Sequence, residues 1–236
     1  MKKKIAIFLA ARSGSKRLPN KHTLNINLNY TVIDLCIKRL KKAKLVNKIY
    51  LCTTKKQIDN KFINICKSHK INLYRGSTNN VLKRLIDCAI KNSIDIIVRI
   101  TADCPIIDPK LIDDCIKLHY KHRSDYTSNT LKPSFPDGLD VEVINLKALL
   151  KSQKISKSKL NKEHVTHYIQ TSKLFKKYNY KNTKNYSNRR WTLDYVEDYL
   201  FLKSVIKYFT PNIYFSWKDL IIAEKKNKFL INIQKR

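Results

Sequence analysis

Long apolar runs, glycine and linker-like segments are scarce in this chain of 236 residues. No apolar run approaches the ~18 residues that a membrane-spanning helix needs, so we expect no membrane partner. No internal repeat, low-complexity linker or sharp shift of composition divides the chain. We therefore expect a single domain over residues 1–236, which at this length buries roughly 70% of its unfolded surface without a disulfide or a structural metal.

Paired-cysteine motifs are also missing. The six cysteines form no CxxC pair, and most lie in apolar periodic segments, as free thiols of a core do. The start MKKKIAIFLAA resembles a secretory signal, but its apolar run is short, and Arg12 and Arg17 follow where a small-residue cleavage site is expected. A first buried strand is the better interpretation, and we expect a cytoplasmic protein with neither disulfides nor structural zinc.

Acidic residues are few, with 18 Asp and Glu against 49 Lys and Arg, for a formal charge of +31. Such a charge can mark a nucleic-acid binder. The lysines are spread over the whole chain, however, and Asn, Ile and Tyr are abundant while Gly, Ala and Arg are scarce. An AT-rich coding sequence produces this bias, so compositional drift is the favoured interpretation, and we expect no nucleic-acid partner. The charge should still attract anionic substrates.

Apolar runs alternate with amphipathic segments through the first half of the chain. Continuous apolar runs predict buried strands, and apolar residues at helical spacing predict helices. Strands are expected over 4–10, 49–54, 71–74 and 94–100, and helices over 31–43, 57–69, 81–92 and 109–121. Alternating strands and helices indicate a doubly wound α/β fold with a mostly parallel sheet. Ligands of such folds bind at the carboxyl ends of the strands.

The second half of the chain is less regular. Strands are expected over 140–144 and 188–194, helices over 161–172 and 195–208, and a solvated loop over 151–162. Asp108, directly before Pro109, is expected to cap the helix that follows it.

The three glycines, Gly14, Gly76 and Gly138, fall in predicted loops. Glycine adopts positive φ and lets the backbone approach a ligand closely, so we expect these positions to require it, although Gly76 is better explained as a plain turn residue. The stretch AARSGSKRLPNK (10–21) follows the first strand and surrounds Gly14 with basic side chains, namely Arg12, Lys16, Arg17 and Lys21. Backbone N–H groups and cations together predict a phosphate or nucleotide site, although neither GxxxxGK[ST] nor GxGxxG is present.

Acidic and histidine clusters follow later in the chain. Asp103, after the strand 94–100, lies where a carboxylate can hold Mg²⁺ or merely cap a turn, and Asp194 can supply a second carboxylate. Trp191 is expected in the core. Two further clusters contain Asp137, Asp140 and Glu142 around Gly138, and Glu163, His164 and His167 in KEHVTHY. A zinc site in KEHVTHY is the less favoured interpretation of that cluster, and a hydrogen-bonded helix start the more favoured one.

Seven blocks follow one another along the chain in this order: AARSGSKRLPNK, RGSTNNVLKR, VRITADCPIIDP, YTSN, PDGLDVEV, EHVTHYI and RWTLD. Taken together, they resemble the cytidylyltransferase family. The family includes the acylneuraminate and 3-deoxy-manno-octulosonate cytidylyltransferases, and the resemblance is strongest to its spore-coat polysaccharide biosynthesis branch. The blocks span residues 4 to about 200. Two departures stand out: Asn20 replaces the glycine usual before Lys21, and Asn79 and Asn80 replace an acidic residue.

The resemblance implies a Rossmann-like nucleotidyltransferase that uses CTP and Mg²⁺, with an irregular α+β arm over about 130–185 for the acceptor and for a homodimer contact. It implies Arg12, Lys21 and Asp103 as catalytic residues and Asp103 and Asp194 as Mg²⁺ ligands. The implied nucleotide-binding residues are Ala10, Ala11, Arg12, Ser13, Gly14, Lys21, Arg84 and Asp103. The implied acceptor-binding residues are Arg99, Asp137, Gly138, Asp140, Glu142, Glu163 and His164.

The implied reaction couples CMP to an acidic 3-deoxy-2-keto sugar, or to a similar hydroxyl acceptor, and releases pyrophosphate. The proton acceptor is left open between a carboxylate of the acceptor, a metal-bound position and His164. The alternatives are a nucleotidyltransferase of the same fold with another acceptor and a glycosyltransferase, which usually requires a DxD pair that is not found after Asp103. A nucleic-acid-binding module is less favoured still, because stacked aromatics in an RNP-like pattern are missing.

Overall fold

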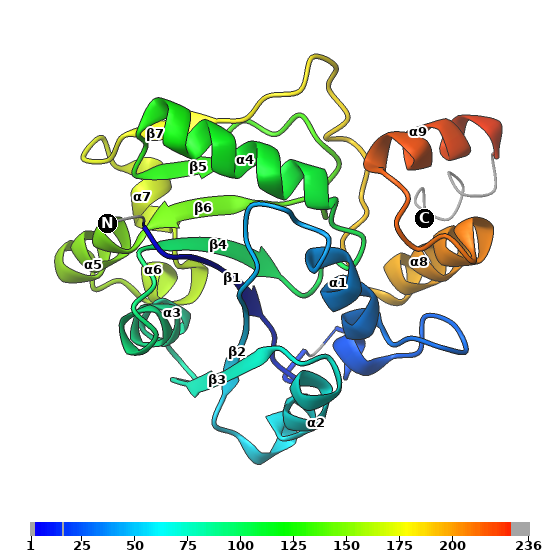
Figure 1. The fold of residues 1–236 in the computed structure, drawn as a ribbon, viewed down its shortest axis with the longest axis horizontal. Helices are drawn as coiled ribbons and strands as arrows, with labels where there is room; N and C mark the ends of the chain where they lie inside the picture. The colour runs from blue at the N-terminus through cyan, green and yellow to red at the C-terminus, as the bar shows by residue number, and fades with distance from the viewer. Residues whose placement is uncertain (1–2, 16, 228–236) are drawn as a thin grey trace.

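A twisted sheet with helices on both faces forms the centre of the molecule (Figure 1). In the computed structural model, which describes residues 3–15 and 17–227, the sheet has seven strands in the order β3-β2-β1-β4-β6-β5-β7. The strands are β1 (Ile5–Ala10), β2 (Ile49–Thr54), β3 (Asn72–Gly76), β4 (Ile96–Thr101), β5 (Tyr126–Ser128), β6 (Glu142–Asn145) and β7 (Lys177–Asn179). β1 to β4 are parallel, and β6 runs antiparallel to both β4 and β5. The predicted doubly wound, mostly parallel α/β fold is therefore confirmed.

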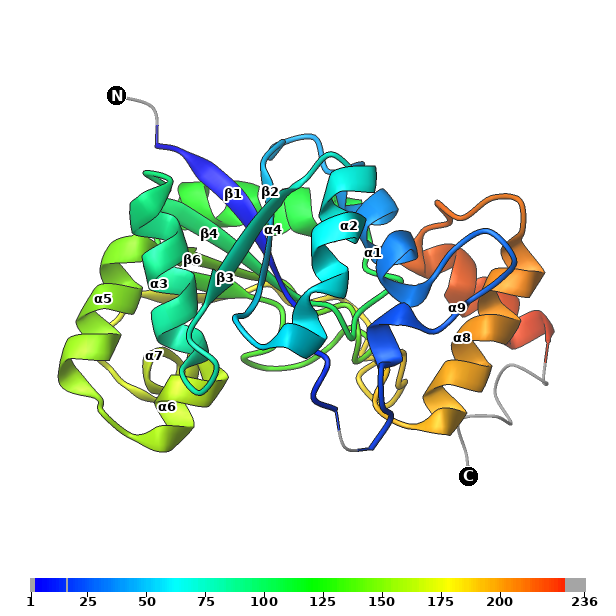
Figure 2. The ribbon, with the colours of Figure 1, turned by 90° about the horizontal axis from the view of Figure 1, so that it is seen from below.

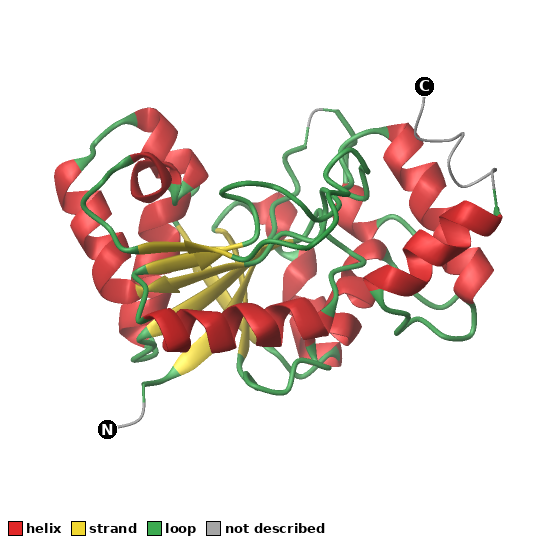
Figure 3. Cartoon of the chain, turned by 90° about the horizontal axis from the view of Figure 1, so that it is seen from above, coloured by secondary structure: helices red, strands yellow, loops and turns green. Residues whose placement is uncertain are grey.

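Helices cover both faces of this sheet, as Figures 2 and 3 show from opposite sides. One face packs against α1 (Val32–Leu40), α2 (Lys61–Ser68) and α4 (Pro109–His122), and its core continues into α8 (Val196–Phe209) and α9 (Trp217–Lys226). The other face packs against α3 (Val81–Lys91), α5 (Leu146–Ile155) and α7 (His167–Thr171), with α6 (Lys159–His164) beside α3. Short 3₁₀ turns, η1 (Lys21–Thr23) and η2 (Gln57–Asp59), follow β1 and β2.

The strand β1 shows why an unbroken apolar run suits this position. Ala6 and Phe8 point into the core on the α3 side, and Ile7 and Leu9 point into the core on the α1 side. All four side chains are fully buried. A strand with both faces covered must be apolar at every position, so β1 is the predicted buried first strand.

Local capping agrees with the sequence in the first half of the chain. The Asp108 side chain accepts a hydrogen bond from the Lys110 N–H at the start of α4, as predicted, and Pro109 occupies the first turn. The Thr31 hydroxyl accepts from the Asp34 N–H, and the Asp34 carboxylate accepts from the Thr31 N–H, so a capping box starts α1. These caps fix where the helices begin after each loop of the site.

Three predicted elements of the second half are wrong. The expected strand 188–194 makes only an isolated bridge, between Asp137 and Arg190, because its backbone bonds go to two different loops instead of one partner strand. The expected helix 161–172 is broken at Val165, which has a φ of 58°. The expected loop 151–162 instead contains the end of α5 and the start of α6. In addition, β5, β7 and α9 were not predicted.

All six cysteines are free and buried, as expected for core thiols. Trp191 is fully buried, as predicted. Within residues 3–15 and 17–227, no helix has both the length and the apolar character needed to cross a membrane.

Candidate functional site: two adjoining pockets at the carboxyl edge of the sheet

The carboxyl ends of β1 and β4 lie side by side, with Ala10 paired to Thr101 in the parallel register. The strand order changes direction at this point, because the chain runs from β1 out to β3 and then returns to the other side of β1. Crevices at such switch points are where α/β sheets bind ligands. A pocket of about 530 Å³ lies here, between the loops that follow β1 and β4.

We call this cavity the basic pocket, because guanidinium and ammonium groups outnumber carboxylates among its lining residues. Its charged lining consists of Arg12, Arg17, Lys21, Arg84, Arg99, Asp103, Glu163 and Asp194. Ala10, Ala11 and Gly14 line it as well. The structure thus brings together nearly all the residues that the resemblance implied for the nucleotide.

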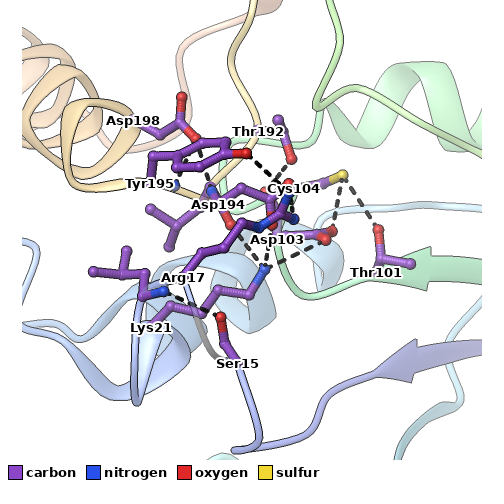
Figure 4. Close-up of polar contacts among 12 residues, drawn as sticks. Ser15, Arg17, Lys21, Thr101, Asp103, Cys104, Thr192, Asp194, Tyr195 and Asp198 are labelled. Carbon is purple, nitrogen blue, oxygen red and sulfur yellow. Dashed lines mark hydrogen bonds and ion pairs between the residues drawn. The ribbon is translucent and has the colours of Figure 1, made fainter.

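Lys21 is buried where two segments distant in the sequence meet. Its ammonium donates to the Leu193 carbonyl oxygen at 2.8 Å and to Asp194 Oδ1 at 3.0 Å, and it lies 3.6 Å from Asp103 Oδ2. Figure 4 shows the ammonium pointing between the two carboxylates. Asp103 and Asp194 therefore converge on one point, which the lysine occupies.

The same two carboxylates fit the expected Mg²⁺ ion. Burial alone would raise the pKa of Asp103, but the Lys21 ammonium and the Thr101 hydroxyl outweigh it and lower that pKa, so the carboxylate is charged at neutral pH. Ionised carboxylates are the hard oxygen donors that Mg²⁺ prefers. Among the described residues no group of three or more His, Cys, Asp and Glu could hold a metal, so a cation here would depend on phosphate and water for its other ligands.

Asp194 is held by further cations and by a carboxylate side chain of α8. Arg17 contacts its Oδ2 at 2.8 Å, and Arg190 approaches the same oxygen at 3.5 Å. The Asp194 N–H donates to Asp198 at 2.8 Å, and this carboxylate also caps α8. Asp194 thus comes from an irregular segment that several partners fix in place.

Ser13 anchors the loop after β1 to the η2 turn. Its N–H donates to Asp59 Oδ1 at 2.8 Å and its hydroxyl to the Ile58 carbonyl, and the residue is only 6% exposed. Ser13 is not among the residues that line the basic pocket. Its contacts therefore fix the loop, while Arg12 and Gly14 on either side line the pocket. Lys16, part of the same motif, lies outside the described residues.

Asn20 explains one departure from the family pattern. It has φ 55° and ψ 20°, the left-handed conformation in which glycine is the default and Asn is tolerated best among other residues. Its side chain also accepts a hydrogen bond from Lys61 at 2.6 Å. The second departure has a similar local explanation, since the Asn80 side chain caps α3 by accepting from the Lys83 N–H.

Two buried cationic or titratable side chains line the basic pocket without a full set of partners. Arg84, which is 2% exposed, donates from Nη1 to the Ser77 carbonyl, but its Nε has no hydrogen-bond partner among the residues that the structure describes. His22 is also buried, and in the described part of the chain its Nδ1 has no hydrogen-bond partner. Burial and the neighbouring Lys21 lower the pKa of His22 to about 4, so this imidazole is neutral at pH 7. The sequence analysis missed His22, and its position directly after Lys21 was the available signal.

A second pocket, of about 420 Å³, adjoins the first, and Arg99, Thr101 and His164 line both. We call it the acidic pocket, because Asp140 and Glu142 line it against the single guanidinium of Arg99. Its remaining lining residues are Thr130, Leu160, Thr166, His167 and Gln170. Of these, only His167 was singled out from the sequence; Thr166 lies in the EHVTHYI block, whereas Thr130, Leu160 and Gln170 lie outside the seven blocks.

Four implied acceptor residues lie at the acidic pocket, and three lie elsewhere. Arg99, Asp140, Glu142 and His164 line it, whereas Glu163 lines the basic pocket, 3.5 Å from Arg12. Asp137 and Gly138 line neither pocket. Asp137 contacts Arg190 at 3.5 Å, and Gly138 allows the backbone of 191–192 to pass against it.

A doubly wound α/β sheet with a basic loop and paired carboxylates at its switch point defines a nucleotidyltransferase-like protein. Comparison with known proteins agrees, since residues 6–232 match the cytidylyltransferase family. The chain belongs to this family and is an enzyme of the nucleotidyltransferase class. The resemblance that the seven sequence blocks carry is thereby confirmed.

Individual relatives extend this result. The spore coat polysaccharide biosynthesis protein SpsF of Bacillus subtilis is 31% identical over 172 residues, which cover 70% of this chain and 69% of the relative. The solved structure of a cytidylyltransferase from Leptospira borgpetersenii is 36% identical, with a TM-score of 0.94 over 100% of this chain and 98% of that one. A CMP:2-keto-3-deoxy-manno-octonic acid synthetase solved with CTP is 12% identical, with a TM-score of 0.63 over 87% of this chain and 99% of that one, and shows the shared fold.

Proposed function

We propose that the enzyme transfers the cytidylyl group of CTP to a hydroxyl acceptor, with release of pyrophosphate, in the biosynthesis of a surface polysaccharide. The observation that carries the proposal is the convergence of Asp103 and Asp194 on the Lys21 ammonium beside a second, acceptor-sized pocket. The SpsF relative, named for polysaccharide biosynthesis, supports the proposed role.

In this proposal the triphosphate occupies the basic pocket. Lys21 and Arg12 offset the negative charge that builds on the leaving pyrophosphate, which is how fixed charges lower such barriers. Mg²⁺ held by Asp103 and Asp194 would supply charge neutralisation at the phosphates. The acceptor hydroxyl attacks the α-phosphorus from the acidic pocket, and the bond to pyrophosphate breaks.

His164 is the side chain that we propose takes the proton of the acceptor hydroxyl. It lines both pockets, so it lies at their boundary, where the two substrates would meet. An imidazole within hydrogen-bond reach of a reacting oxygen can act as its general base.

Pyrophosphate release from each of the four nucleoside triphosphates tests the activity. The assay includes Mg²⁺ and a panel of sugar acids, neutral sugars and polyols. We expect release to require CTP and to fall at least about a hundredfold in Asp103→Asn, because a charge that acts on the transition state is lost. Asp87→Asn, in an ion pair on the surface of α3, serves as the matched control and should retain activity. Release with another nucleotide in preference to CTP, or full activity of Asp103→Asn, would contradict the proposal.

Binding of Mg²⁺ has a separate test that does not use activity. In Lys21→Met the two carboxylates lose the ammonium between them, so a cation should stabilise this variant more than the wild type. We expect an added stability of about 1.4 kcal/mol when the ion is at ten times its dissociation constant, measured by thermal unfolding. Asp103→Asn in the same background should abolish the gain. An equal effect of Mg²⁺ on the wild type and on all variants would show that these carboxylates do not hold it.

A homodimer and a cytoplasmic location also remain proposals. Large apolar side chains are exposed along α5 to α7 and the loop that follows, namely Leu150, Ile155, Leu160 and Leu174. They lie in the predicted arm and support a dimer contact there. Sedimentation at micromolar concentration should give twice the 27.8 kDa of the chain. Six free, buried thiols support a reducing compartment.

A further inference from the structure

The permanent charges of the acidic pocket do not suit an anionic ligand. Among the described residues that line it, Arg99 is the only Arg or Lys, and it faces Asp140 and Glu142. The guanidinium of Arg99 is engaged by the carboxylate of Glu142, so its charge is already neutralised. One carboxylate, Asp140, is then left without a cation among the lining residues.

The carboxylate of Glu142 is bonded to groups of the protein and stays paired with Arg99 when a ligand binds. Its carboxylate accepts hydrogen bonds from the Tyr126 hydroxyl at 2.7 Å and from the Thr166 hydroxyl at 2.6 Å, and the residue is only 5% exposed. Burial alone would raise its pKa, but Arg99 and these hydroxyls outweigh that effect and lower it, so Glu142 is ionised. A buried, fully partnered carboxylate is a fixed negative charge in the wall of the pocket.

The pKa of Asp140 reflects the environment inside the acidic pocket. Burial, and then the nearby carboxylates of Asp137 and Glu142, raise its pKa to about 7. A site that disfavours ionisation of its own carboxyl group disfavours the entry of a second carboxylate for the same reason. The carboxylates that add to this effect stand in contrast to the formal charge of +31 of the whole chain.

We propose that the acidic pocket takes an uncharged polyhydroxyl acceptor, a sugar or polyol without a carboxylate, and rejects the 3-deoxy-2-keto sugar acids that the family resemblance implies. This inference rests on the proposed cytidylyl transfer and names its acceptor class. The polar lining suits hydroxyl groups: Thr130 and Thr166 offer hydroxyls, Gln170 an amide, and Asp140 a carboxylate.

Two cationic groups near the boundary between the two pockets do not change the expected preference for an uncharged acceptor. Arg12 is drawn away by Glu163, 3.5 Å from its guanidinium, on the side of the basic pocket. Nε of Arg99 is buried and has no hydrogen-bond partner within residues 3–15 and 17–227, so it can donate one hydrogen bond to a ligand oxygen. A single donor of this kind can bind a hydroxyl oxygen of an uncharged acceptor, and alone it does not supply the second cation that a carboxylate ligand would need here.

The sign of the field can be measured without knowing the acceptor. A single thiol is introduced in each pocket, as Thr130→Cys in the acidic one and Ser15→Cys in the basic one, both at lining positions. The six native cysteines are buried and give little background. Each variant reacts with a cationic trimethylammonium-ethyl and an anionic sulfonato-ethyl methanethiosulfonate, and the two rates are divided by those of a free thiol.

We expect the cationic reagent to react at least about tenfold faster than the anionic one at Thr130→Cys, and the order to reverse at Ser15→Cys. Adding Asp140→Asn to Thr130→Cys should reduce the preference, because the uncompensated carboxyl group is removed. A faster reaction of the anionic reagent at Thr130→Cys overturns the proposal, whatever substrates the enzyme is later found to use.

Turnover then compares acceptor classes at saturating CTP. We expect the best uncharged sugar or polyol to exceed every sugar acid by at least about a hundredfold in kcat/KM, and a sugar acid as the best acceptor overturns the inference. Protection of Ser15→Cys by CTP reports nucleotide binding independently. If CTP does not protect, cytidylyl transfer itself is wrong, whereas protection combined with a preference for acids refutes only the acceptor class.

Discussion

At the scale of single residues, Asp140 makes the fold sensitive to pH. Its pKa of about 7 in the folded protein lies above the ordinary 3.8, so between these values the folded state holds a proton that the unfolded chain has released. Stability therefore falls as the pH rises through this window. Asp140→Asn lacks the titrating group, and we expect its stability relative to the wild type to improve by on the order of 2–4 kcal/mol between pH 4 and pH 8.

Urea unfolding of both proteins at pH 4, 6 and 8 measures this difference. Asp87→Asn on α3 is the control, and the difference between it and the wild type should vary little with pH. A difference between Asp140→Asn and the wild type that stays constant from pH 4 to pH 8 would show that Asp140 titrates normally.

Sequence patterns identified the charged site residues better than the neutral ones. Lys21, Asp103 and Asp194 belong to dense sequence motifs, and the structure brings them to one point. Ser13 lies in the same motif as Lys21, yet its N–H and its hydroxyl are bonded to Asp59 and Ile58, and it does not line the basic pocket. Thr130 and Gln170 carry no motif at all, and only the folding of the second half of the chain brings them to the acidic pocket.

At the scale of elements, the turn at Gly138 sets the position of the segment that carries Asp194. Gly138 has a φ of 102°, and a Cβ there would lie 2.5 Å from the backbone nitrogen of Thr192 and the carbonyl carbon of Trp191. We expect Gly138→Ala to lower the free energy of unfolding by at least about 2 kcal/mol, since both the strained φ and the backbone contact oppose a side chain. Equilibrium unfolding in urea measures the loss.

Gly14→Ala is the matched substitution. A Cβ at Gly14 would meet nothing within 4 Å among the described residues, so this change should alter stability by less than about 1 kcal/mol in either direction. The expectation that Gly14 stands where no other residue fits is thus not supported by space, whereas the same expectation for Gly138 is confirmed. A loss in Gly138→Ala as small as that in Gly14→Ala would show that the segment 191–192 moves away readily.

Elements with a strong local pattern were predictable, and those defined by distant contacts were not. The strands β1, β2 and β4 and the helix α4 follow from apolar spacing and caps, close to the predicted ranges. The break between α6 and α7 was hidden, because it falls at Val165, a residue that strongly disfavours a φ of 58° and gives no turn signal. The segment 188–194 reads as a strand, yet its partners are the loops at Asp137 and Asp103.

At the scale of the whole molecule, the two signs of charge are distributed differently. The 49 lysines and arginines are spread along the chain, which is consistent with compositional drift. Many of the 18 acidic residues gather around the two pockets instead, namely Asp103, Asp137, Asp140, Glu142, Glu163, Asp194 and Asp198. A positive molecule with a locally acidic pocket can attract the nucleotide over long range and still receive an uncharged second substrate.

The last prediction concerns this long-range attraction. CTP is a polyanion, so its association rate should fall by on the order of tenfold or more between 0.02 and 0.5 M NaCl, as mobile ions screen the +31 charge. Contacts within the basic pocket are shorter than the screening length, so the dissociation rate should change much less. Stopped-flow measurements with a fluorescent CTP analogue separate the two rates. Cytidine that carries the same fluorophore and no phosphate provides the uncharged control. An association rate for CTP that does not depend on salt would mean that the scattered lysines contribute no steering and that Arg12, Arg17 and Lys21 capture the triphosphate only on contact.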